Sequence, residues 1–160
     1  MMFNSVLPLA LLASLAAADY RCATNAGSFT ITNDIAKAAV ANGGTNTKTS
    51  SRFPHGFAGM SGNGTPGDHL HKGTQLKFYG ADSRCNEKQD DDPEKSNLLE
   101  FPVFQNGKSF NKDEKRDKGV LTPARVVYVK SDMTLCGVMT HAVKNTDGSG
   151  EGDFRVCDSN

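Results

Sequence analysis

Four ionisable side chains lie within apolar, strand-like stretches of this sequence, and their types together could carry out acid–base chemistry on a phosphate ester. They are His55, Glu100, Arg125 and His141. A carboxylate or an imidazole can remove the proton from an attacking hydroxyl group, and a protonated imidazole can donate one to the leaving oxygen. A guanidinium stabilises the charge that builds on phosphorus. This set suits cleavage of RNA by its own 2′-hydroxyl group, which needs no metal ion or other cofactor because the substrate supplies the nucleophile.

Residues 122–142 predict the β-hairpin that would position two of these side chains. Two runs of β-branched and apolar residues flank a short polar turn. If the turn centres on Asp132, Arg125 lies opposite Met139, and His141 lies two residues further along the same face, roughly 7–8 Å away across the ladder. An arginine and a histidine on one face predict an anion site with a titratable partner. The alternative is that both are strand ends in contact with solvent.

The other two ionisable residues belong to separate strand candidates. In the run 98–104 the large apolar side chains alternate on one face, and Glu100 is left on the other. A carboxylate in so apolar a run is either exposed at a sheet edge or placed there for function. His55 directly follows Pro54, whose fixed φ makes that segment rigid.

Residues 1–18 are apolar and uncharged and end in three alanines, which is typical of a secretory signal peptide. A membrane anchor would need about 20 apolar residues and a charged flank, so we expect a secreted, extracellular protein without membrane contact. The remaining residues, 19–160, have the length of a single domain.

The 18 basic and 18 acidic residues cancel. Such a chain cannot bind a polyanion over a broad basic face, so a nucleic-acid partner would be held locally.

An even number of cysteines in an exported chain predicts two disulfides, for which the sequence allows three pairings. No two of them form a CxxC pair, so a zinc site is not expected. The cysteines are Cys22, Cys85, Cys136 and Cys157.

One helix and about five strands, without βαβ alternation, predict an α+β fold in which a short helix packs on one face of a twisted antiparallel sheet. Thr32 or Asn33 caps the helix, and Gly43-Gly44 ends it. Residues 75–79 are a further strand candidate. The expected apolar stripe of the helix consists of Ile35, Ala38 and Ala39.

The segment between His55 and Glu100 is rich in glycine and charged residues, and we expect it to form extended loops. It contains the glycosylation sequon Asn63-Gly64-Thr65. Three potential metal ligands also lie there, and on a Gly-rich loop we expect them to be solvated rather than to bind metal. They are Asp68, His69 and His71.

In order along the chain, six segments resemble the fungal extracellular guanyl-preferring ribonucleases of the ribonuclease T-one family, which includes a purine-preferring type. Each alone is a weak signal, but the six in family order are specific and span nearly all of residues 19–160. They are Tyr20-Arg21-Cys22, Phe53-Pro54-His55, Leu99-Glu100-Phe101-Pro102, Ala124-Arg125-Val126-Val127-Tyr128, Gly137-Val138-Met139-Thr140-His141 and Phe154-Arg155-Val156-Cys157.

The resemblance implies a microbial ribonuclease-like fold and a metal-independent endoribonuclease that cleaves single-stranded RNA in two steps. Glu100, assisted by His55, would activate the 2′-hydroxyl group, and His141 would protonate the leaving 5′-oxygen to give a 2′,3′-cyclic phosphate. His141 would then activate water to open this ring, and Arg125 with Phe154 would support the phosphate. DNA would not be cleaved, because it lacks the nucleophile. The enzyme is expected to act as a monomer.

The resemblance also implies how the cysteines pair. The family's bridge between the chain ends corresponds to Cys22–Cys157, and Cys85–Cys136 is similar to a second bridge in purine-preferring members. Cys136 is expected on the hairpin face opposite Arg125. There it would tie the hairpin to the insertion between His55 and Glu100, a segment much longer than is usual in the family.

Two departures from the family affect substrate binding. The family usually has a tyrosine where this chain has Phe53, so one hydroxyl group that would contact the phosphate is missing. Phe57 could still stack on a base, but the segment Ala58-Gly59-Met60-Ser61 lacks the glutamate with which the family reads guanine. We therefore predict a purine preference that leans toward guanine but is relaxed.

A second class of function is a secreted effector or interaction protein that keeps the ribonuclease-like scaffold but binds RNA or a host partner with little or no catalysis. Relatives of that kind typically lack several of the four ionisable groups. This chain retains all four, which favours an active enzyme. Such an enzyme could itself be deployed as an effector against a host-cell target.

Overall fold

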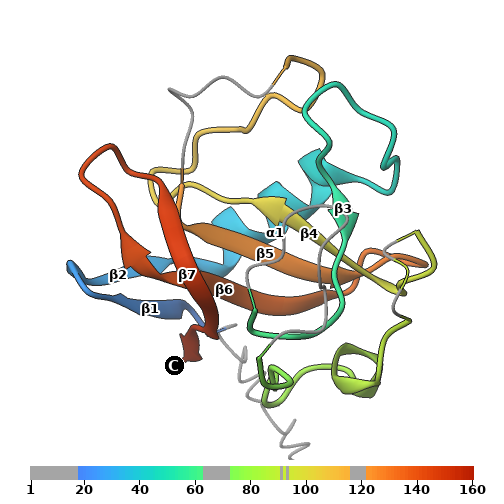
Figure 1. Cartoon of the computed structure of the whole chain (residues 1–160), viewed down its shortest axis with the longest axis horizontal. Helices are drawn as coiled ribbons and strands as arrows, with labels where there is room; N and C mark the ends of the chain where they lie inside the picture. The colour runs from blue at the N-terminus through green and yellow to red at the C-terminus, as the bar shows by residue number, and fades with distance from the viewer. Residues whose placement is uncertain (1–17, 63–72, 91, 93, 116–121) are drawn as a thin grey trace, which may run out of the picture.

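The computed structural model describes residues 18–62, 73–90, 92, 94–115 and 122–160. Within them lie two antiparallel sheets, one α-helix and one short 3₁₀ helix, as Figure 1 shows. The predicted signal peptide before residue 18, the sequon at Asn63 and the candidate ligands Asp68, His69 and His71 lie outside the described residues. No helix in the described part of the chain is long and apolar enough to span a membrane.

The larger sheet confirms the predicted α+β class. Its strand order is β3-β4-β5-β6-β7, and every neighbouring pair is antiparallel. Its strands are β3 (His55–Gly56), β4 (Leu98–Pro102), β5 (Ala124–Val129), β6 (Leu135–Lys144) and β7 (Gly150–Val156).

The smaller sheet joins the two ends of the domain, with the strand order β2-β1-β8. A disulfide between Cys22 and Cys157 links β1 to the residue just before β8, which is the pairing that the resemblance implies. The strands are β1 (Tyr20–Thr24), β2 (Gly27–Ile31) and β8 (Asp158–Ser159).

The helix α1 (Asn33–Gly43) begins and ends where the sequence predicts. The Thr32 hydroxyl oxygen accepts a hydrogen bond from the Ile35 N–H at 3.3 Å. Gly44, with a φ of 63°, donates its N–H to the Val40 carbonyl at 3.0 Å. The Thr32 side chain thus satisfies one N–H group that the helix itself cannot, and the Gly44 bond closes the last turn.

The buried face of α1 differs in part from the predicted stripe. Ala38 is exposed, and Ile35 and Ala39 lie at the margin of the core. Alanines occur on several sides of this helix, so their spacing does not reveal which side meets the sheet. The residues that are buried are Ala36, Val40 and Gly43.

Each face of the larger sheet carries its own hydrophobic core. The helix-side core lies between the sheet and α1, and its strand residues include Leu99, Phe101, Val126, Tyr128 and Val138. The insertion-side core, on the other face, includes Leu98, Val127, Val129 and Met139. Phe57 joins them, as do Phe78 and Cys85 from the insertion (residues 58–97). Because both faces are covered, every residue of β4 and β5 is buried.

The hairpin of β5 and β6 has the predicted register, with Arg125 opposite Met139. The register shifts between Val127 and Tyr128, where Cys136 is the extra residue of a β-bulge. The bulge turns Cys136 into the insertion-side core, which also contains Met139. The expectation that Cys136 lies on the face opposite Arg125 is therefore wrong.

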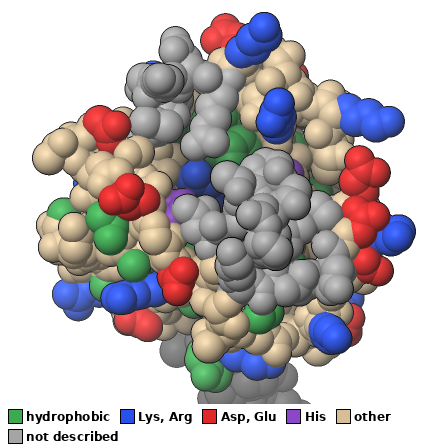
Figure 2. Space-filling model, in the orientation of Figure 1, with side chains coloured by type: hydrophobic (Ala, Val, Ile, Leu, Met, Phe, Trp, Pro, Cys, Tyr) green, Lys and Arg blue, Asp and Glu red, His purple; other side chains and the backbone are tan. Residues whose placement is uncertain are grey.

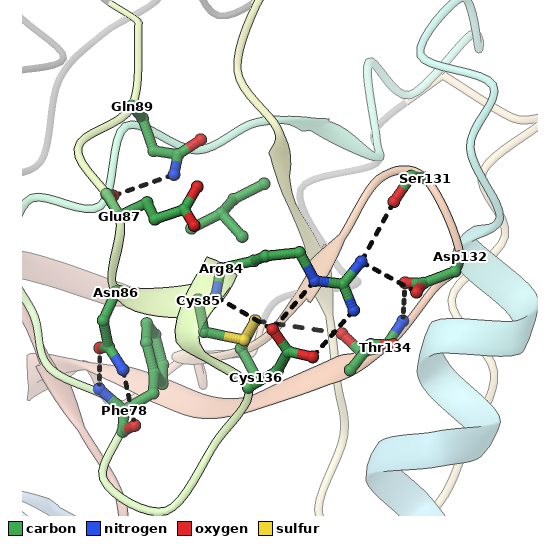
Figure 3. The surroundings of a disulfide bond; sticks show 12 residues. Phe78, Arg84, Cys85, Asn86, Glu87, Gln89, Ser131, Asp132, Thr134 and Cys136 are labelled. Carbon is green, nitrogen blue, oxygen red and sulfur yellow. Dashed lines mark hydrogen bonds and ion pairs between the residues drawn. A yellow bond between two sulfur atoms is a disulfide. The ribbon is translucent and has the colours of Figure 1, made fainter.

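Two links anchor the insertion to this hairpin. The 3₁₀ helix η1 (Ser83–Asn86) is joined to the bulge by the disulfide Cys85–Cys136, again the implied pairing. Figure 3 shows Arg84 reaching from η1 to the turn between β5 and β6, where its guanidinium lies 3.0 Å from the Asp132 carboxylate. The insertion is thus held at both the bulge and the turn of the hairpin.

Residues 75–79 do not form the predicted strand, and only Gln75 makes an isolated bridge, with Met60. The Asn86 side chain accepts a hydrogen bond from the Phe78 N–H at 2.8 Å and donates one to the Phe78 carbonyl at 3.1 Å, as drawn in Figure 3. These two bonds satisfy backbone groups that a neighbouring strand would otherwise satisfy.

Gly43→Ala should destabilise the fold, although alanine is the better helix former. A Cβ atom at this position would lie 2.7 Å from the Tyr128 hydroxyl oxygen and 3.0 Å from the Phe101 ring. We expect the free energy of unfolding in urea to fall by about 1–3 kcal/mol, the usual cost of overpacking a core. In the Tyr128→Phe background this loss of unfolding free energy should be smaller, because the hydroxyl oxygen nearest to the added Cβ atom is absent. Equal losses in both backgrounds, or a gain in stability, would contradict this account.

Candidate active site

The larger sheet brings all four ionisable residues to its insertion-side face. His55 on β3 pairs with Glu100 on β4, and Arg125 on β5 pairs with Met139, two residues before His141 on β6. Residues paired across antiparallel strands point to the same side, and alternate residues of one strand share a face. The four side chains therefore lie on one surface, which includes the shared face predicted for Arg125 and His141.

His55 and Glu100 form an ion pair in which Nε2 and Oε1 are 3.0 Å apart. The Glu100 side chain is almost fully buried, whereas 41% of the His55 side chain is exposed. The other ring nitrogen of His55, Nδ1, lies 3.1 Å from the Gly56 carbonyl oxygen, which can only accept a hydrogen bond. With Nδ1 donating there and Nε2 facing a carboxylate, this environment favours the doubly protonated, charged imidazole.

This pair shifts both pKa values toward the charged forms. Burial by itself raises the pKa of Glu100, but the charge and hydrogen bond of His55, with the charges of Arg125 and His141, lower it below its ordinary value. Burial likewise disfavours the charged form of His55, but the charge and hydrogen bond of Glu100, with the bond to Gly56, raise the pKa of His55 above its ordinary value. Glu100 is therefore ionised at neutral pH.

Arg125 is buried in a fixed orientation. Its Nη1 donates to the Thr122 carbonyl at 2.7 Å and to the Ala124 carbonyl at 2.9 Å. The guanidinium carbon lies 5.3 Å from the centre of the Phe53 ring, a cation–π distance. Phe53 in turn stacks on His55, with ring centres 4.7 Å apart. One aromatic ring thus sets the spacing between the guanidinium and the imidazole.

His141 is held by β7, the neighbouring strand. Its Nδ1 lies 2.9 Å from the Gly152 carbonyl oxygen. Because that oxygen only accepts, Nδ1 carries a proton, and Nε2 is the nitrogen that can gain or lose one. The ring lies against that of Phe154, its partner on β7, with ring centres 4.0 Å apart.

Gly150 also belongs to the surroundings of His141. A Cβ atom at Gly150 would come within 2.6 Å of the His141 ring, so the close approach of β7 requires a residue without a side chain. The sequence pattern indicates only a Gly-rich turn at 147–153 and does not single out this contact.

The three aromatic residues expected to bind substrate have different surroundings. Phe53 stacks on His55, and Phe154 lies tilted against His141, so each supports an ionisable ring. Phe57 instead packs in the insertion-side core with only 6% of its surface exposed. Its burial favours a packing role over base stacking.

Charge on this side of the molecule is mixed. In Figure 2, histidine side chains and a basic side chain lie near the middle of the view, and acidic and basic side chains are interspersed around the rim. Among the residues that the structure describes, no group of three or more His, Cys, Asp and Glu side chains is arranged to hold a metal ion. The basic and histidine side chains in the middle of this view give local positive charge, in keeping with the neutral composition.

Comparison with known proteins shows relatives for nearly the whole domain. A family model described as ribonuclease matches residues 19–158. Ribonuclease clavin of Aspergillus clavatus is 35% identical over 115 residues, which cover 69% of this chain and 60% of clavin. Ribonuclease mitogillin of Aspergillus fumigatus is 36% identical with the same coverage. The chain thus spans about 60% of the length of the curated relatives that it matches.

Solved structures share the fold. The crystal structure of the Aspergillus ribotoxin restrictocin matches with a TM-score of 0.65 and 25% identity, over 88% of this chain and 99% of restrictocin. Restrictocin complexed with a 29-mer sarcin/ricin domain RNA analogue matches with a TM-score of 0.63. Hirsutellin A from Hirsutella thompsonii is 26% identical, with a TM-score of 0.60 over 89% of this chain and 99% of its own.

Glu100→Gln should destabilise the protein in a pH-dependent way. Because folding lowers the pKa of Glu100, its ionised form stabilises the fold at pH values above the ordinary pKa of 4.5. This stability is lost as the pH falls through the lower pKa of the folded state. Because folding raises the pKa of His55, its charged form stabilises the fold at pH values below the ordinary pKa of 6.5. This stability is lost as the pH rises through the higher pKa of the folded state. The unfolding free energies of wild type and variant should therefore differ most between pH 4.5 and 6.5. We expect a difference of about 1–3 kcal/mol, less than for a fully buried ion pair, because solvent screens the partly exposed His55.

Urea titrations at a series of pH values measure this difference. The exposed Glu87→Gln change is the matched control and should stay within about 0.5 kcal/mol of wild type at every pH. A difference between wild type and Glu100→Gln that does not vary with pH would contradict the proposed electrostatic pairing.

Proposed function

The chain belongs to the ribonuclease family, and from that membership and the geometry of its site we propose that it is a metal-independent endoribonuclease that cleaves single-stranded RNA through a 2′,3′-cyclic phosphate. One observation carries the proposal: a carboxylate–imidazole pair, a guanidinium and a second imidazole meet on one face of the sheet. The proposed catalytic residues are His55, Glu100, Arg125 and His141.

In the first step, Glu100 accepts the proton of the 2′-hydroxyl group as the 2′-oxygen attacks phosphorus. The bond between phosphorus and the 5′-oxygen breaks, and Nε2 of protonated His141 gives its proton to that oxygen. The charged His55 at 3.0 Å keeps Glu100 ionised and oriented before this step. The products are one strand that ends in a 2′,3′-cyclic phosphate and another that begins with a 5′-hydroxyl group.

In the second step, the same two residues exchange roles. Neutral His141 takes a proton from water as the water oxygen attacks phosphorus, and protonated Glu100 returns its proton to the 2′-oxygen. Both residues end in the forms in which they began, so the cycle consumes water and no cofactor.

Arg125 would stabilise the negative charge on the phosphoryl oxygens in both steps. Its two bonds to backbone carbonyls orient the guanidinium before substrate binds, and charge that is oriented in advance stabilises a transition state at little further cost. The Phe53 and Phe154 rings would position the two imidazoles that they contact.

The base preference in this proposal is for purines, leaning toward guanine. The resemblance of six sequence segments to the guanyl- and purine-preferring ribonucleases supports it. Strict selection of guanine is not expected, because residues 58–61 contain no carboxylate. The burial of Phe57 also leaves less aromatic surface for stacking on the base.

Secretion is part of the proposal. A signal peptide at residues 1–18 would precede the ribonuclease domain at 19–160, and the two disulfides suit an oxidising, extracellular setting. Restrictocin has been solved with a sarcin/ricin domain RNA analogue. By analogy, we propose that this chain binds RNA. We further propose that it acts as a monomer on single-stranded RNA, which could belong to a host cell.

His141→Ala should lower the rate of RNA cleavage by at least about 100-fold, because it removes the acid for the leaving oxygen. Purified protein and a short single-stranded RNA in EDTA give the rate, and a cyclic phosphate among the products reports the reaction path. The same RNA with one 2′-deoxynucleotide at the cleavage position should stay whole. Circular dichroism and urea unfolding show whether the variant is folded. A wild type that leaves RNA whole, or a folded variant that cleaves equally well, would refute the proposal and favour a non-catalytic interaction protein.

Dinucleoside phosphates that differ only in the 5′ nucleoside test the base preference. We expect guanosine and adenosine substrates to be cleaved at least about tenfold faster than uridine and cytidine substrates, the effect of roughly one hydrogen bond. The cleavage rates for guanosine and adenosine substrates should differ by less than about tenfold, because this chain lacks the glutamate whose charged hydrogen bond reads guanine in the family. Equal or faster cleavage after pyrimidines would exclude the purine preference.

A further inference from the structure

A groove lies between the β1–β2 hairpin and the turn that joins β6 to β7. Figure 1 shows these two hairpins beside each other, and the Asn25 N–H donates to the Ala142 carbonyl between them at 3.0 Å. The groove has a volume of about 470 Å³, within the range of small-ligand sites. Its walls include Phe29, Gln105, Asn106, Thr122, Pro123 and Lys144.

Two wall residues are bonded to proposed catalytic residues. The Thr122 carbonyl accepts a hydrogen bond from Arg125 Nη1 at 2.7 Å, and the Pro123 carbonyl accepts one from the His141 N–H at 3.0 Å. Lys144 follows His141 by three residues on the same strand, a separation of about 10 Å. The groove therefore adjoins the proposed catalytic residues through shared backbone hydrogen bonds.

The chemistry of the walls suits a nucleotide. The ring of Phe29 is half-buried, and Lys144 Nζ lies 5.7 Å from its centre. The exposed Gln105 and Asn106 contribute amide groups. Hydrogen bonds within the β6–β7 turn engage the carboxylate of Asp147, and no carboxylate among the described residues forms an ion pair with Lys144. An aromatic face, a cation and amides are the groups with which proteins bind the bases and phosphates of single-stranded RNA.

We propose that this groove binds the RNA nucleotide that follows the leaving nucleoside, with its phosphate at Lys144 and its base against Phe29. The proposal rests on the proposed ribonuclease function, because His141, as the acid for the 5′-oxygen, sets the direction of the strand. The Cα atoms of His141 and Lys144 lie about 10 Å apart along β6, and strand alternation sends their side chains to opposite faces. Lys144 is therefore suited not to the scissile phosphate but to the next one, where the RNA would pass over the end of the sheet. In a chain without net charge, such a local cation is the means by which a longer RNA would be held.

Binding of uncleavable RNA tests the groove independently of catalysis. The probes are a GA dinucleotide and a GAA trinucleotide whose first residue is 2′-deoxyguanosine and therefore lacks the nucleophile. Wild type should bind the trinucleotide about three- to tenfold more tightly than the dinucleotide, since it adds one lysine–phosphate contact and one base. Lys144→Gln should remove most of this gain and reduce the slope of log affinity against log salt by about 0.7, the value for one phosphate contact on a single strand.

Two further variants separate charge from stacking. Lys37→Gln removes the same charge from the exposed surface of α1 and should keep both the affinity gain and the salt slope. Phe29→Leu keeps apolar contact with the helix-side core but removes the flat ring, so it should lower trinucleotide affinity while the salt slope stays. A trinucleotide that binds no more tightly than the dinucleotide, or a Lys144→Gln variant that keeps the full gain, would overturn the proposal.

Cleavage of the corresponding all-ribose substrates distinguishes failure of this proposal from failure of the proposed function. In Lys144→Gln, the ratio of kcat/KM for the trinucleotide to kcat/KM for the dinucleotide should fall about three- to tenfold, in line with the binding loss. An unchanged ratio beside normal cleavage would overturn the groove and leave the enzyme intact. If wild type cleaves neither RNA, the proposed function fails, and the binding measurements still decide whether the groove holds the nucleotide.

Discussion

The site depends on keeping one carboxylate ionised inside a sheet. Glu100 is buried on β4, and transferring an unpaired charge into such surroundings costs several kcal/mol. The imidazole of His55 at 3.0 Å and the positive charge of Arg125 offset that cost. Without them the carboxyl group would take up a proton, and it could not then accept one from a hydroxyl group. The electrostatics that make the buried charge tolerable therefore also prepare the proposed base.

His55 and Arg125 lie near Glu100 only while strands β3, β4 and β5 keep their register. Several independent features of the structure hold these strands in place. The two hydrophobic cores cover both faces of the sheet. The Cys85–Cys136 bridge and the ion pair between Arg84 and Asp132 fix the insertion to the hairpin that carries Arg125 and His141. The Cys22–Cys157 bridge joins the chain ends. In a chain of 37% apolar residues and no tryptophan, such cross-links restrain strands that a modest core would hold less firmly.

The molecule separates the proposed chemistry from the proposed recognition of RNA. The proposed reacting groups stand on the neighbouring strands β3, β4, β5 and β6, where strand pairing sets their register. The surface that would choose the base is the loop after His55. The groove that would hold the rest of the strand lies at the margin of the larger sheet, where residues of β2 and β6 meet loops and turns. Loops can change without disturbing the sheet, so relatives of this chain can keep one reaction and differ in the RNA that they select.

The sequence by itself determined the class of fold, the limits of the helix and the residues that share the face of the site. Alternation along a strand and the capping of a helix are local properties, so the pattern around Glu100, Arg125 and His141 was sufficient. Only the tertiary structure decided that a bulge turns Cys136 to the face of the site, that Ala38 faces outward, and that Gly150 lies against His141. Each of these depends on the approach of another segment of the chain, and a local pattern contains no information about how closely that segment packs.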